Sequence, residues 1–243
     1  MTRRDGSSIV VHMKIQLLTE TRSPAEYLGD DAWCAQEKIN GERLQIHKAG
    51  GEVRGFNRRG AGRSIPAATL ALALLSPHDW QIDGEIVGDT FTAFDALAIN
   101  GADICQLPQS ARFAALSEVS PFAIVRQSDG DDKAALLASV IEDQGEGVVF
   151  KLSDASYQDG RDAAAVKYRL WQSESFVVAD IDIAKGTTGL RRDGKDCGRC
   201  SFRFDSIWPK VGEIVEVRFS ARGKTGKCIH PVMIGTRTDL ELV

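Results

Sequence analysis

The sequence has no long apolar run, few cysteines and no excess of positive charge. No stretch approaches the roughly 18 apolar residues that a membrane-spanning helix needs, and residues 1–9 are too polar for a secretion signal. The five cysteines are an odd number scattered along 243 residues, so we expect reduced thiols rather than a disulfide framework. These absences predict a cytoplasmic protein without a membrane partner.

Composition excludes several classes of protein but selects none. Charged residues make up 26% and aromatic residues 7% of the chain, which is ordinary for a globular protein and unlike collagen, disordered chains or coiled coils. The length allows one large domain or two unequal ones. The formal net charge is -4, so the chain as a whole gives no indication of a nucleic-acid partner.

The first two thirds of the chain mix strand and helix patterns. The predicted elements are a hairpin over 44–58 around Gly50-Gly51, a helix over 64–75 capped by Ser64, strands over 81–87 and 91–97, helices over 109–119 and 131–143, and short buried strands over 147–152 and 165–170. Strands in hairpins beside helices favour an α+β class over a doubly wound sheet.

Beyond residue 170 the pattern changes to strands alone. Strands are predicted over 176–183, 201–204, 213–219 and 232–234. About 70 residues of short strands and turns is typical of a small all-β barrel, for which the OB-fold is one candidate. We therefore predict two domains, 1–172 and 173–243, with a linker at 171–174.

Charge divides near the same boundary. Residues 1–172 carry a net charge of -6 and residues 173–243 a net charge of +2. Within 185–227 there are eleven Lys and Arg residues against five Asp and Glu residues. This excess indicates a phosphate-binding surface, although a solvated barrel face would have the same composition.

The stretch from Glu37 to Arg43 can bring an amine to a phosphate. Lys38 is followed by a turn that contains Gly41 and then by Arg43, whose guanidinium can neutralise phosphate oxygens. A lysine that has lost its proton can attack phosphorus. Taken alone, however, one such lysine is usually a surface residue.

Two further stretches carry carboxylates or an aromatic ring in apolar surroundings. In Asp83-Gly84-Glu85 the two carboxylates are two residues apart, so they project together if the strand runs through Gly84. Glu85 lies among apolar residues and needs a partner, either a metal, a sugar hydroxyl or a basic side chain. Phe94 fits a core position, which its periodicity favours, or a platform for a flat ring.

The last two stretches place charges around short buried strands. Glu146 and Lys151 bracket one such run, and Lys167 and Arg169 share one face of the next. Two cations in line can meet an anion such as a polyphosphate. A salt-bridged sheet edge is the alternative for each stretch taken separately.

In their order along the chain, these motifs resemble those of ATP-dependent DNA ligases. These enzymes belong to the covalent nucleotidyltransferase superfamily, together with RNA ligases and messenger-RNA capping enzymes. The signature Lys-x-Asp-Gly-x-Arg matches Lys38, Gly41 and Arg43, with Asn40 at the aspartate position, and 57–60 is similar to the Ser-Arg-x-Gly element. The later stretches follow in the family's order, and 212–219 with 229–239 resembles its closing strands.

The resemblance implies a minimal two-domain ligase. The fold would be a nucleotidyltransferase (ATP-grasp-like ligase) domain followed by an OB-fold barrel. ATP would be the substrate that gives a covalent lysyl-AMP, Mg²⁺ or another divalent cation would assist, and the partner would be nicked duplex DNA bound by a monomer. Roles in DNA repair, replication and recombination would follow.

The resemblance also assigns residues to roles. Catalysis is assigned to Lys38, Lys151 and Lys167. Nucleotide binding is assigned to Glu37, Arg43, Arg58, Glu85, Phe94, Glu146, Lys151, Lys167 and Arg169. Metal binding is assigned to Glu85 and Glu146. Nucleic-acid binding is assigned to Arg58, Arg59, Lys185, Arg191, Arg192, Arg218 and Lys224.

Two other functions stay open at this stage. An RNA ligase or a capping-type nucleotidyltransferase uses the same lysyl-nucleotide chemistry, and Asn40 occurs in some RNA-joining members. A non-catalytic OB-fold protein with a degenerate nucleotide pocket would leave Lys38 idle. The family's terminal Arg-x-Asp-Lys motif also lacks its lysine, since Leu240 follows Asp239.

Histidine and cysteine give weaker signals. Cys197, Cys200, Cys228 and His230 have the residue types of a zinc site, but their spacing is atypical and strand or turn cysteines are the favoured interpretation. The histidines at 12, 47 and 78 have no partner spacing, so we expect them to face solvent or to cap a turn.

Overall fold

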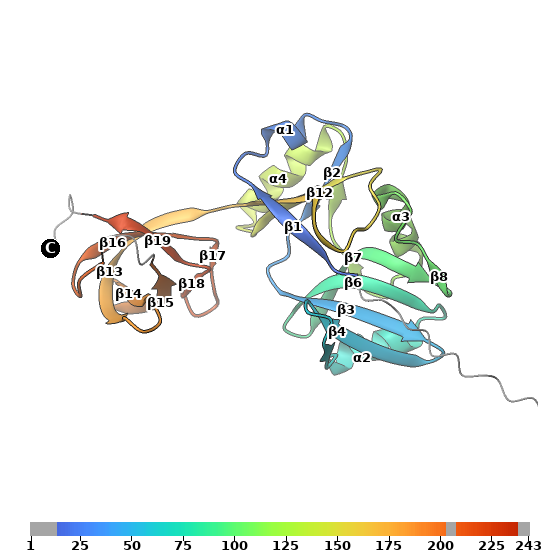
Figure 1. Cartoon of the computed structure of the whole chain (residues 1–243), viewed down its shortest axis with the longest axis horizontal. Helices are drawn as coiled ribbons and strands as arrows, with labels where there is room; N and C mark the ends of the chain where they lie inside the picture. The colour runs from blue at the N-terminus through green and yellow to red at the C-terminus, as the bar shows by residue number, and fades with distance from the viewer. Residues whose placement is uncertain (1–13, 203–207, 238–243) are drawn as a thin grey trace, which may run out of the picture. The chain divides into compact units, whose positions relative to one another are not determined.

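The computed structural model describes residues 14–202 and 208–237, which form two compact units (Figure 1). The first unit holds residues 14–138 and 148–168, and the second holds 139–147 and 169–237. Apart from the segment 139–147, the chain passes into the second unit at residue 169, close to where the sequence pattern changes to strands alone.

The larger sheet of the first unit is built mainly from antiparallel neighbours. Its path is β5-β4-β3-β6-β7-β8, and β9 pairs in parallel with β7. The strands are β3 (Glu42–Ala49), β4 (Glu52–Asn57), β5 (Gly62–Arg63), β6 (Trp80–Val87), β7 (Thr90–Ile99), β8 (Ala102–Asp103) and β9 (Ala123–Ile124). Gly50 and Gly51 both have positive φ between β3 and β4, as a tight hairpin turn requires. The hairpin predicted over 44–58 is confirmed.

A second sheet brings three of the chemistry-bearing stretches side by side. Its order is β1-β12-β11-β2-β10. The strands are β1 (Gln16–Thr21), β2 (Trp33–Glu37), β10 (Gln127–Ser128), β11 (Gly147–Leu152) and β12 (Gly160–Arg169). Glu37 pairs with Val148 across β2 and β11, and Glu20 pairs with Lys167 across β1 and β12. Lys151 and Lys167 therefore lie on the neighbouring strands β11 and β12, and Lys38 directly follows β2, the strand on the other side of β11.

Helices and aromatic rings complete the core of the first unit. The helices among the described residues are α1 (Ala25–Leu28), α2 (Ala67–Leu75), α3 (Gln109–Val119) and α4 (Asp132–Glu142). Phe122 meets Trp80 and Phe91 edge to face, with ring centroids 5.5 and 4.8 Å apart. These rings are buried with Leu44, and Leu116 of α3 packs into the same cluster. The apolar alternation of β3, β6 and β7 thus builds the core that supports the site.

The second unit contains a closed barrel, drawn in orange and red in Figure 1. Around the barrel the order is β13-β14-β15-β19-β16. The strands are β13 (Gln172–Asp182), β14 (Thr187–Arg192), β15 (Lys195–Ser201), β16 (Ile214–Phe219) and β19 (Val232–Thr236), with a separate hairpin of β17 (Ala221–Arg222) and β18 (Cys228–Ile229). Phe176 and Phe219 are buried at its centre. Closure pairs the strand edges that an open sheet would expose.

Several boundaries differ from the sequence prediction; for example, the strand expected from residue 165 begins at Gly160. The helix expected from residue 64 begins at Ala67, and Pro66 rather than Ser64 is its N-cap, because a residue before proline is pushed out of the helical region. The strand expected from residue 201 begins at Lys195, after a turn in which Asp193 and Gly194 have positive φ. Phe204 lies outside the described residues. Strand β13 starts at Gln172, within the segment expected to link the domains.

The cysteine thiols are reduced, and burial makes several of them weakly acidic. All five cysteines are free and buried. Burial raises the pKa of Cys34 to about 11 and the pKa of Cys105 and Cys200 to about 12. Thiols of this kind are inert side chains of the core. Among the described residues, no helix has the length and apolar character to span a membrane.

The expectation that His47 faces solvent or caps a turn is wrong. Its ring lies 4.8 Å from the Phe56 ring, and within the described part of the chain its buried Nε2 has no hydrogen-bond partner. Burial lowers the pKa of His47 to about 4, although the Asp83 charge opposes the shift. The sequence prediction treated His47 as a polar surface residue, but its neighbours on β3, Ile46 and Lys48, are both buried.

His47 should make the fold sensitive to mild acid. Because its folded pKa lies below the unfolded value of about 6.5, the unfolded chain takes up the proton first. Stability should therefore fall as the pH drops from about 6.5 to 4, by about 2 kcal/mol from this residue alone. Urea unfolding at pH 7 and pH 4.5 measures the loss. His47→Gln should lose less over the same interval, and an equal loss in both proteins would contradict this origin.

Candidate nucleotide site

Asp83 organises a buried cluster on the first unit. Its carboxylate is fully buried and accepts hydrogen bonds from Arg43, with Nε at 2.9 Å, and from the Tyr157 hydroxyl at 2.6 Å. Arg43 also donates to the Gln16 carbonyl at 2.6 Å and to the Tyr157 hydroxyl at 2.9 Å. Burial by itself would lower the pKa of Arg43, but the adjacent Asp83 charge raises it. The guanidinium therefore stays charged and fixed in one orientation.

Asp95 organises a second buried cluster close by on β7. It accepts from Arg112 at 2.9 and 3.2 Å and from the Lys151 amine at 3.1 Å. Burial would raise the pKa of Asp95, but Lys151 and Arg112 together lower it. Nη1 of Arg112 donates hydrogen bonds to the carbonyls of Leu107 and Ala155. The Asp95 carboxylate thus pairs with two cations, and its ion pair with Lys151 fixes the position of the Lys151 amine.

Phe94 lies between the two clusters. The Arg43 guanidinium is 5.2 Å and the Lys151 amine 5.1 Å from its ring centroid. The Phe94 carbonyl accepts from Gln36 at 3.2 Å. Phe94 is half-buried, whereas Phe91 on the same strand belongs to the core. The core position that periodicity favours is therefore filled by Phe91, and Phe94 presents part of its ring between two cations.

Lys38 lies in the short connection between β2 and β3, and Gly41 of the same connection lies against β6. It is half-buried, and Glu37 before it pairs with Arg126 at 2.8 Å. A Cβ on Gly41 would lie 2.4 Å from the Ile86 carbonyl and 2.9 Å from the Glu85 side chain. Only glycine lets the connection pass this close to β6. The glycine of the lysine motif is thus required by packing, and it brings the connection against Glu85.

Asp83 and Glu85 play different parts on β6. Asp83 is fully buried, and Glu85 is half-buried opposite Arg43 in the pairing of β3 with β6. A Cβ on Gly84 would lie 2.3 Å from the Phe91 ring, so only glycine fits between the two acids. The sequence prediction looked for a partner of Glu85, but the more deeply buried carboxylate is Asp83.

The remaining predicted charges of this group form ion pairs. On β12, Lys167 lies 3.8 Å from Glu20 of β1. In the second unit, Arg169 donates to the buried Glu146 carboxylate at 3.1 Å. Arg169 also lies 5.8 Å from the Trp171 ring. A ligand that uses any of these cations has to compete with a carboxylate that is already in place.

The predicted nucleic-acid residues are all exposed. Arg58 and Arg59 lie in the β4–β5 turn, where the Asn57 side chain accepts from the Arg59 amide at 2.8 Å. On the barrel, Arg218 lies 4.6 Å from the Trp171 ring and Lys185 pairs with Asp182 at 3.4 Å. The other members are Arg191, Arg192 and Lys224. Arg192 is ion-paired with Glu174.

Sequence reasoning missed two residues that hold the site together. Arg112 is the only basic residue of α3, and a lone cation in a helix that packs on a sheet was the available signal. Tyr157 lies in the connection between β11 and β12, and nothing in its local sequence marks it. Both act on residues far away in the chain, which a local pattern does not reveal.

The described residues contain no cluster of three or more His, Cys, Asp or Glu side chains suited to hold a metal ion. This covers Cys197, Cys200, Cys228 and His230, which the sequence marked by residue type. The His230 ring is engaged instead by the Ser220 hydroxyl at 3.1 Å. The structure gives no support to a zinc site there.

The fold is that of known ligase domains. The ligase domain of Mycobacterium tuberculosis LigD has a TM-score of 0.61 at 21% identity, covering 94% of this chain and 96% of that one. A structure of a Lig E DNA ligase, described as DNA binding with a minimal scaffold, has a TM-score of 0.69 at 18% identity and is covered completely.

Sequence comparison agrees with this fold. The model of the RNA ligase family matches residues 31–169, so the chain belongs to that family. A probable DNA ligase of Beutenbergia cavernae is 31% identical over 193 residues, which is 65% of this chain and 38% of the relative. One of Streptomyces avermitilis is 31% identical over 215 residues, which is 71% of this chain and 41% of the relative. The chain thus spans about two fifths of the length of these curated relatives.

Proposed function

We propose that this chain is the catalytic core of an ATP-dependent DNA ligase that seals nicks in duplex DNA. The observation that carries the proposal is the half-buried Phe94 ring with two cations close to it, Arg43 at 5.2 Å and Lys151 at 5.1 Å from its centroid. Each of these cations is fixed by a buried aspartate, Asp83 or Asp95. A flat apolar surface flanked by fixed cations suits a purine with its ribose and phosphates. The relatives named DNA ligase support the choice of reaction.

The proposed reaction has three steps, and each exchanges one bond to phosphorus for another. The Lys38 amine attacks the α-phosphorus of ATP, so that a nitrogen–phosphorus bond forms, pyrophosphate leaves and the amine loses a proton. The 5′-phosphate at a nick then takes the AMP group, and Lys38 recovers its proton. Finally the 3′-hydroxyl attacks the activated 5′-phosphorus and AMP leaves. Such transfers depend mostly on positioning and charge neutralisation.

The protein's own residues would serve this reaction by position. Phe94 would stack on adenine, while Arg43 and Glu85 would hold the ribose. Lys151, Lys167 and Arg169 would neutralise the phosphates. Because Asp83 already fixes Arg43 and Asp95 already fixes Lys151, little rotamer freedom remains to be lost when the nucleotide binds. Glu37 and Arg58 remain assigned to nucleotide binding by their motifs alone.

A magnesium ion that shares the nucleotide's phosphates is proposed from the motifs alone. Mg²⁺ in such sites takes one or two protein carboxylates and completes its shell with substrate phosphates and water. Glu85 and Glu146 are the carboxylates assigned to it. When bound, the ion supplies charge neutralisation at the phosphate oxygens. A dedicated cage of three or more acidic ligands is not required for this mode.

Two finer assignments belong to the same proposal. We infer that the five-stranded closed barrel is an OB-fold, and that the chain works as two domains, 1–172 and 173–243. The proposed partner is nicked duplex DNA, bound by a monomer through the exposed cations of the barrel and of the β4–β5 turn. An RNA ligase remains the second candidate, because Asn40 replaces the aspartate of the lysine motif and the matching family model is described as RNA ligase.

Nick sealing distinguishes the two candidates. The purified chain with ATP and Mg²⁺ should join a nick in duplex DNA faster than the same nick with an RNA strand, and ATP should support the reaction better than GTP. Sealing of the RNA nick alone would move the assignment to RNA ligase. Absence of sealing on both, with duplex binding intact, would favour the non-catalytic binding protein.

Two neighbouring arginines on the barrel provide a test of the DNA surface. The double variant Arg191→Ala with Arg192→Ala should bind nicked duplex about tenfold more weakly at low salt, and its salt slope should decrease by about two units, because two phosphate contacts are lost. Fluorescence anisotropy over a salt series measures both quantities. Arg54→Ala, which removes an exposed cation from the first unit, is the matched control. Unchanged affinity of the double variant would contradict this surface.

A further inference from the structure

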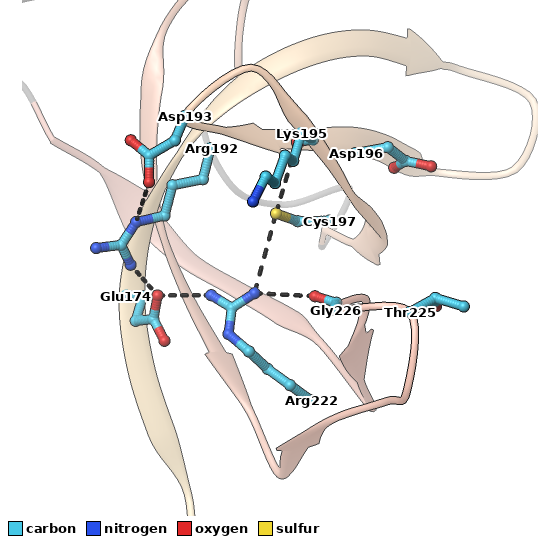
Figure 2. Close-up of a pocket in the computed structure, with 9 residues that line it drawn as sticks. All are labelled: Glu174, Arg192, Asp193, Lys195, Asp196, Cys197, Arg222, Thr225 and Gly226. Carbon is cyan, nitrogen blue, oxygen red and sulfur yellow. Dashed lines mark hydrogen bonds and ion pairs between the residues drawn. The ribbon is translucent and has the colours of Figure 1, made fainter.

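A pocket on the barrel joins two arginines through one carboxylate (Figure 2). Its volume is about 430 Å³, and its lining comes from the start of β13, the β14–β15 turn and the hairpin of β17 and β18. The lining residues are Glu174, Arg192, Asp193, Lys195, Asp196, Cys197, Arg222, Thr225 and Gly226. None of the roles assigned above uses the pocket as a unit.

Both guanidinium groups converge on one oxygen of Glu174. Oε2 of Glu174 accepts from Nη2 of Arg222 at 2.6 Å and also from Nη1 of Arg192. Figure 2 shows the two arginines reaching this oxygen from opposite sides of the pocket. A single oxygen between two guanidinium groups is the arrangement that a phosphate oxygen also adopts.

Arg222 is held in place independently of Glu174. Its Nη1 donates to the Gly226 carbonyl at 2.9 Å and lies 3.9 Å from the Cys197 sulfur. The guanidinium carbon is 5.5 Å from the Phe176 ring centroid and 5.1 Å from that of Phe219. A side chain fixed in this way loses little entropy when it binds an anion. Arg222 would therefore stay in place if Glu174 moved away.

A third cation faces the same space. Figure 2 shows the Lys195 amine pointing into the pocket between Arg192 and Cys197. Within residues 14–202 and 208–237 this amine makes no hydrogen bond or ion pair. The nearby Asp196 is engaged instead by Lys227, at 2.9 Å. Arg192 has a second, longer ion pair with the exposed Asp193, at 3.8 Å, so Lys195 is the cation of this lining that has donors left for a further anion.

We propose that the pocket is a binding site for phosphate oxygens and that Glu174 is the protein's own anion, which occupies the site until a phosphate displaces it. A phosphate has more acceptor oxygens than a carboxylate, so it would bridge Arg192 and Arg222 and reach Lys195 as well. The source of the phosphate is either the backbone of the duplex or a free polyphosphate chain. Only the choice of these two phosphate sources rests on the proposed function.

An internal anion of this kind would keep binding weak and reversible. Each phosphate that enters displaces Glu174. The net gain in binding free energy is therefore the difference between the interactions of the same arginines with phosphate and with the carboxylate. A ligase must release its sealed product, and a site that restores its own ion pair favours release. Removing the Glu174 charge should therefore tighten binding rather than weaken it, which is the opposite of what a purely structural ion pair predicts.

Neutralising Glu174 tests this expectation. Glu174→Gln should bind nicked duplex about three- to tenfold more tightly at low salt, the range of one charge-assisted contact, and its salt slope should be steeper by about one unit. Asp180→Asn is the matched control, since Asp180 is an exposed carboxylate of the same barrel paired with Arg199. It makes the same change in net charge and should alter affinity much less. Equal gains in both variants would overturn the proposal.

A second pair of variants identifies the cationic partners and the source of the phosphate. Arg222→Lys keeps the charge but loses the two-pronged geometry, and in the Glu174→Gln background it should cancel the gain, whereas Arg199→Lys should not. Tripolyphosphate competition separates the sources: a gain confined to duplex affinity assigns the DNA backbone, and a gain for tripolyphosphate alone assigns the free chain. No gain for either ligand overturns the site. Binding is measured at equilibrium, so covalent labelling with ATP in the same preparation reports separately on the proposed function.

Discussion

Replacing Lys38 with alanine should abolish both the covalent nucleotide and nick sealing, with a loss on the order of 10⁴-fold or more in rate, as expected when a covalent nucleophile is removed. Lys38 lies in the connection between two strands rather than inside one, so the fold should survive the change. Intact-protein mass spectrometry after incubation with ATP, together with a nick-sealing assay, measures the effect.

Two controls separate chemistry from charge at Lys38. Lys38→Arg keeps a cation near the phosphates but has no amine that loses its proton readily, so it should be as inactive as the alanine variant. Lys14→Ala removes another lysine of the first unit, one paired with the exposed Asp103, and should keep the adduct. If Lys38→Ala still acquired AMP, another residue would be the nucleophile.

Replacing Asp95 with alanine should destabilise the protein by about 3 to 5 kcal/mol, the cost of leaving buried charges without their partner. Arg112 and Lys151 both point at this one carboxylate from buried positions. Each would lose its counter-ion at once. Urea unfolding monitored by circular dichroism measures the change.

An exposed ion pair supplies the comparison for Asp95. Glu52 pairs with Arg54 at 2.6 Å, but both side chains are 71% exposed, and such pairs contribute about 0.5 kcal/mol or less. Glu52→Ala should therefore shift the unfolding midpoint very little. A similar shift in both variants would mean that the Asp95 cluster does not stabilise the fold.

The pKa of Asp95 also fixes the direction of its pH dependence. Lys151 and Arg112 hold this pKa below its usual range. The contribution of the cluster should be complete above the unfolded value of about 3.9 and should be lost as the pH falls through the lower folded value. This loss occurs at lower pH than the one predicted for His47, so destabilisation by acid should continue below about pH 4, after the His47 contribution has been lost.

Local signals account for the parts of the fold that the sequence predicts well. Gly50-Gly51 specifies a turn by its backbone freedom, and the β3–β4 hairpin follows. The helix over 109–119 agrees with α3 at both ends. Strand β14 was missed although Asp193-Gly194 is a hairpin signal, because charged residues on both sides of the turn obscure the alternation.

Partners at long range explain what the sequence does not reveal about the site. Arg112 reaches Asp95 across 17 residues and Tyr157 reaches Asp83 across 74, and no periodicity connects such pairs. The lysine, arginine and glutamate positions were found through the resemblance of ordered motifs. That resemblance does not show that Arg43, Lys151, Arg169 and Arg192 are already paired with carboxylates.

Charge has to be considered locally in this protein. The net charge of -4 gave no indication of a nucleic-acid partner, and the excess of cations within 185–227 reversed that expectation. The structure adds a further level, because Glu174 neutralises part of this excess at Arg192 and Arg222. The residue count gives the sign of the net charge on a surface. The ion pairs determine which cations have to exchange a carboxylate for a phosphate in order to bind nucleic acid.

The measurement that tests the central proposal most directly is transfer of a labelled nucleotide. The chain is incubated with α-labelled ATP and Mg²⁺, freed of unbound nucleotide, and then given nicked DNA. We predict a covalent label on the protein that is absent in Lys38→Ala, moves to the 5′-phosphate of the nick and is released as AMP on sealing. A protein that acquires no label from ATP, or a label that does not move to nicked DNA, would contradict it.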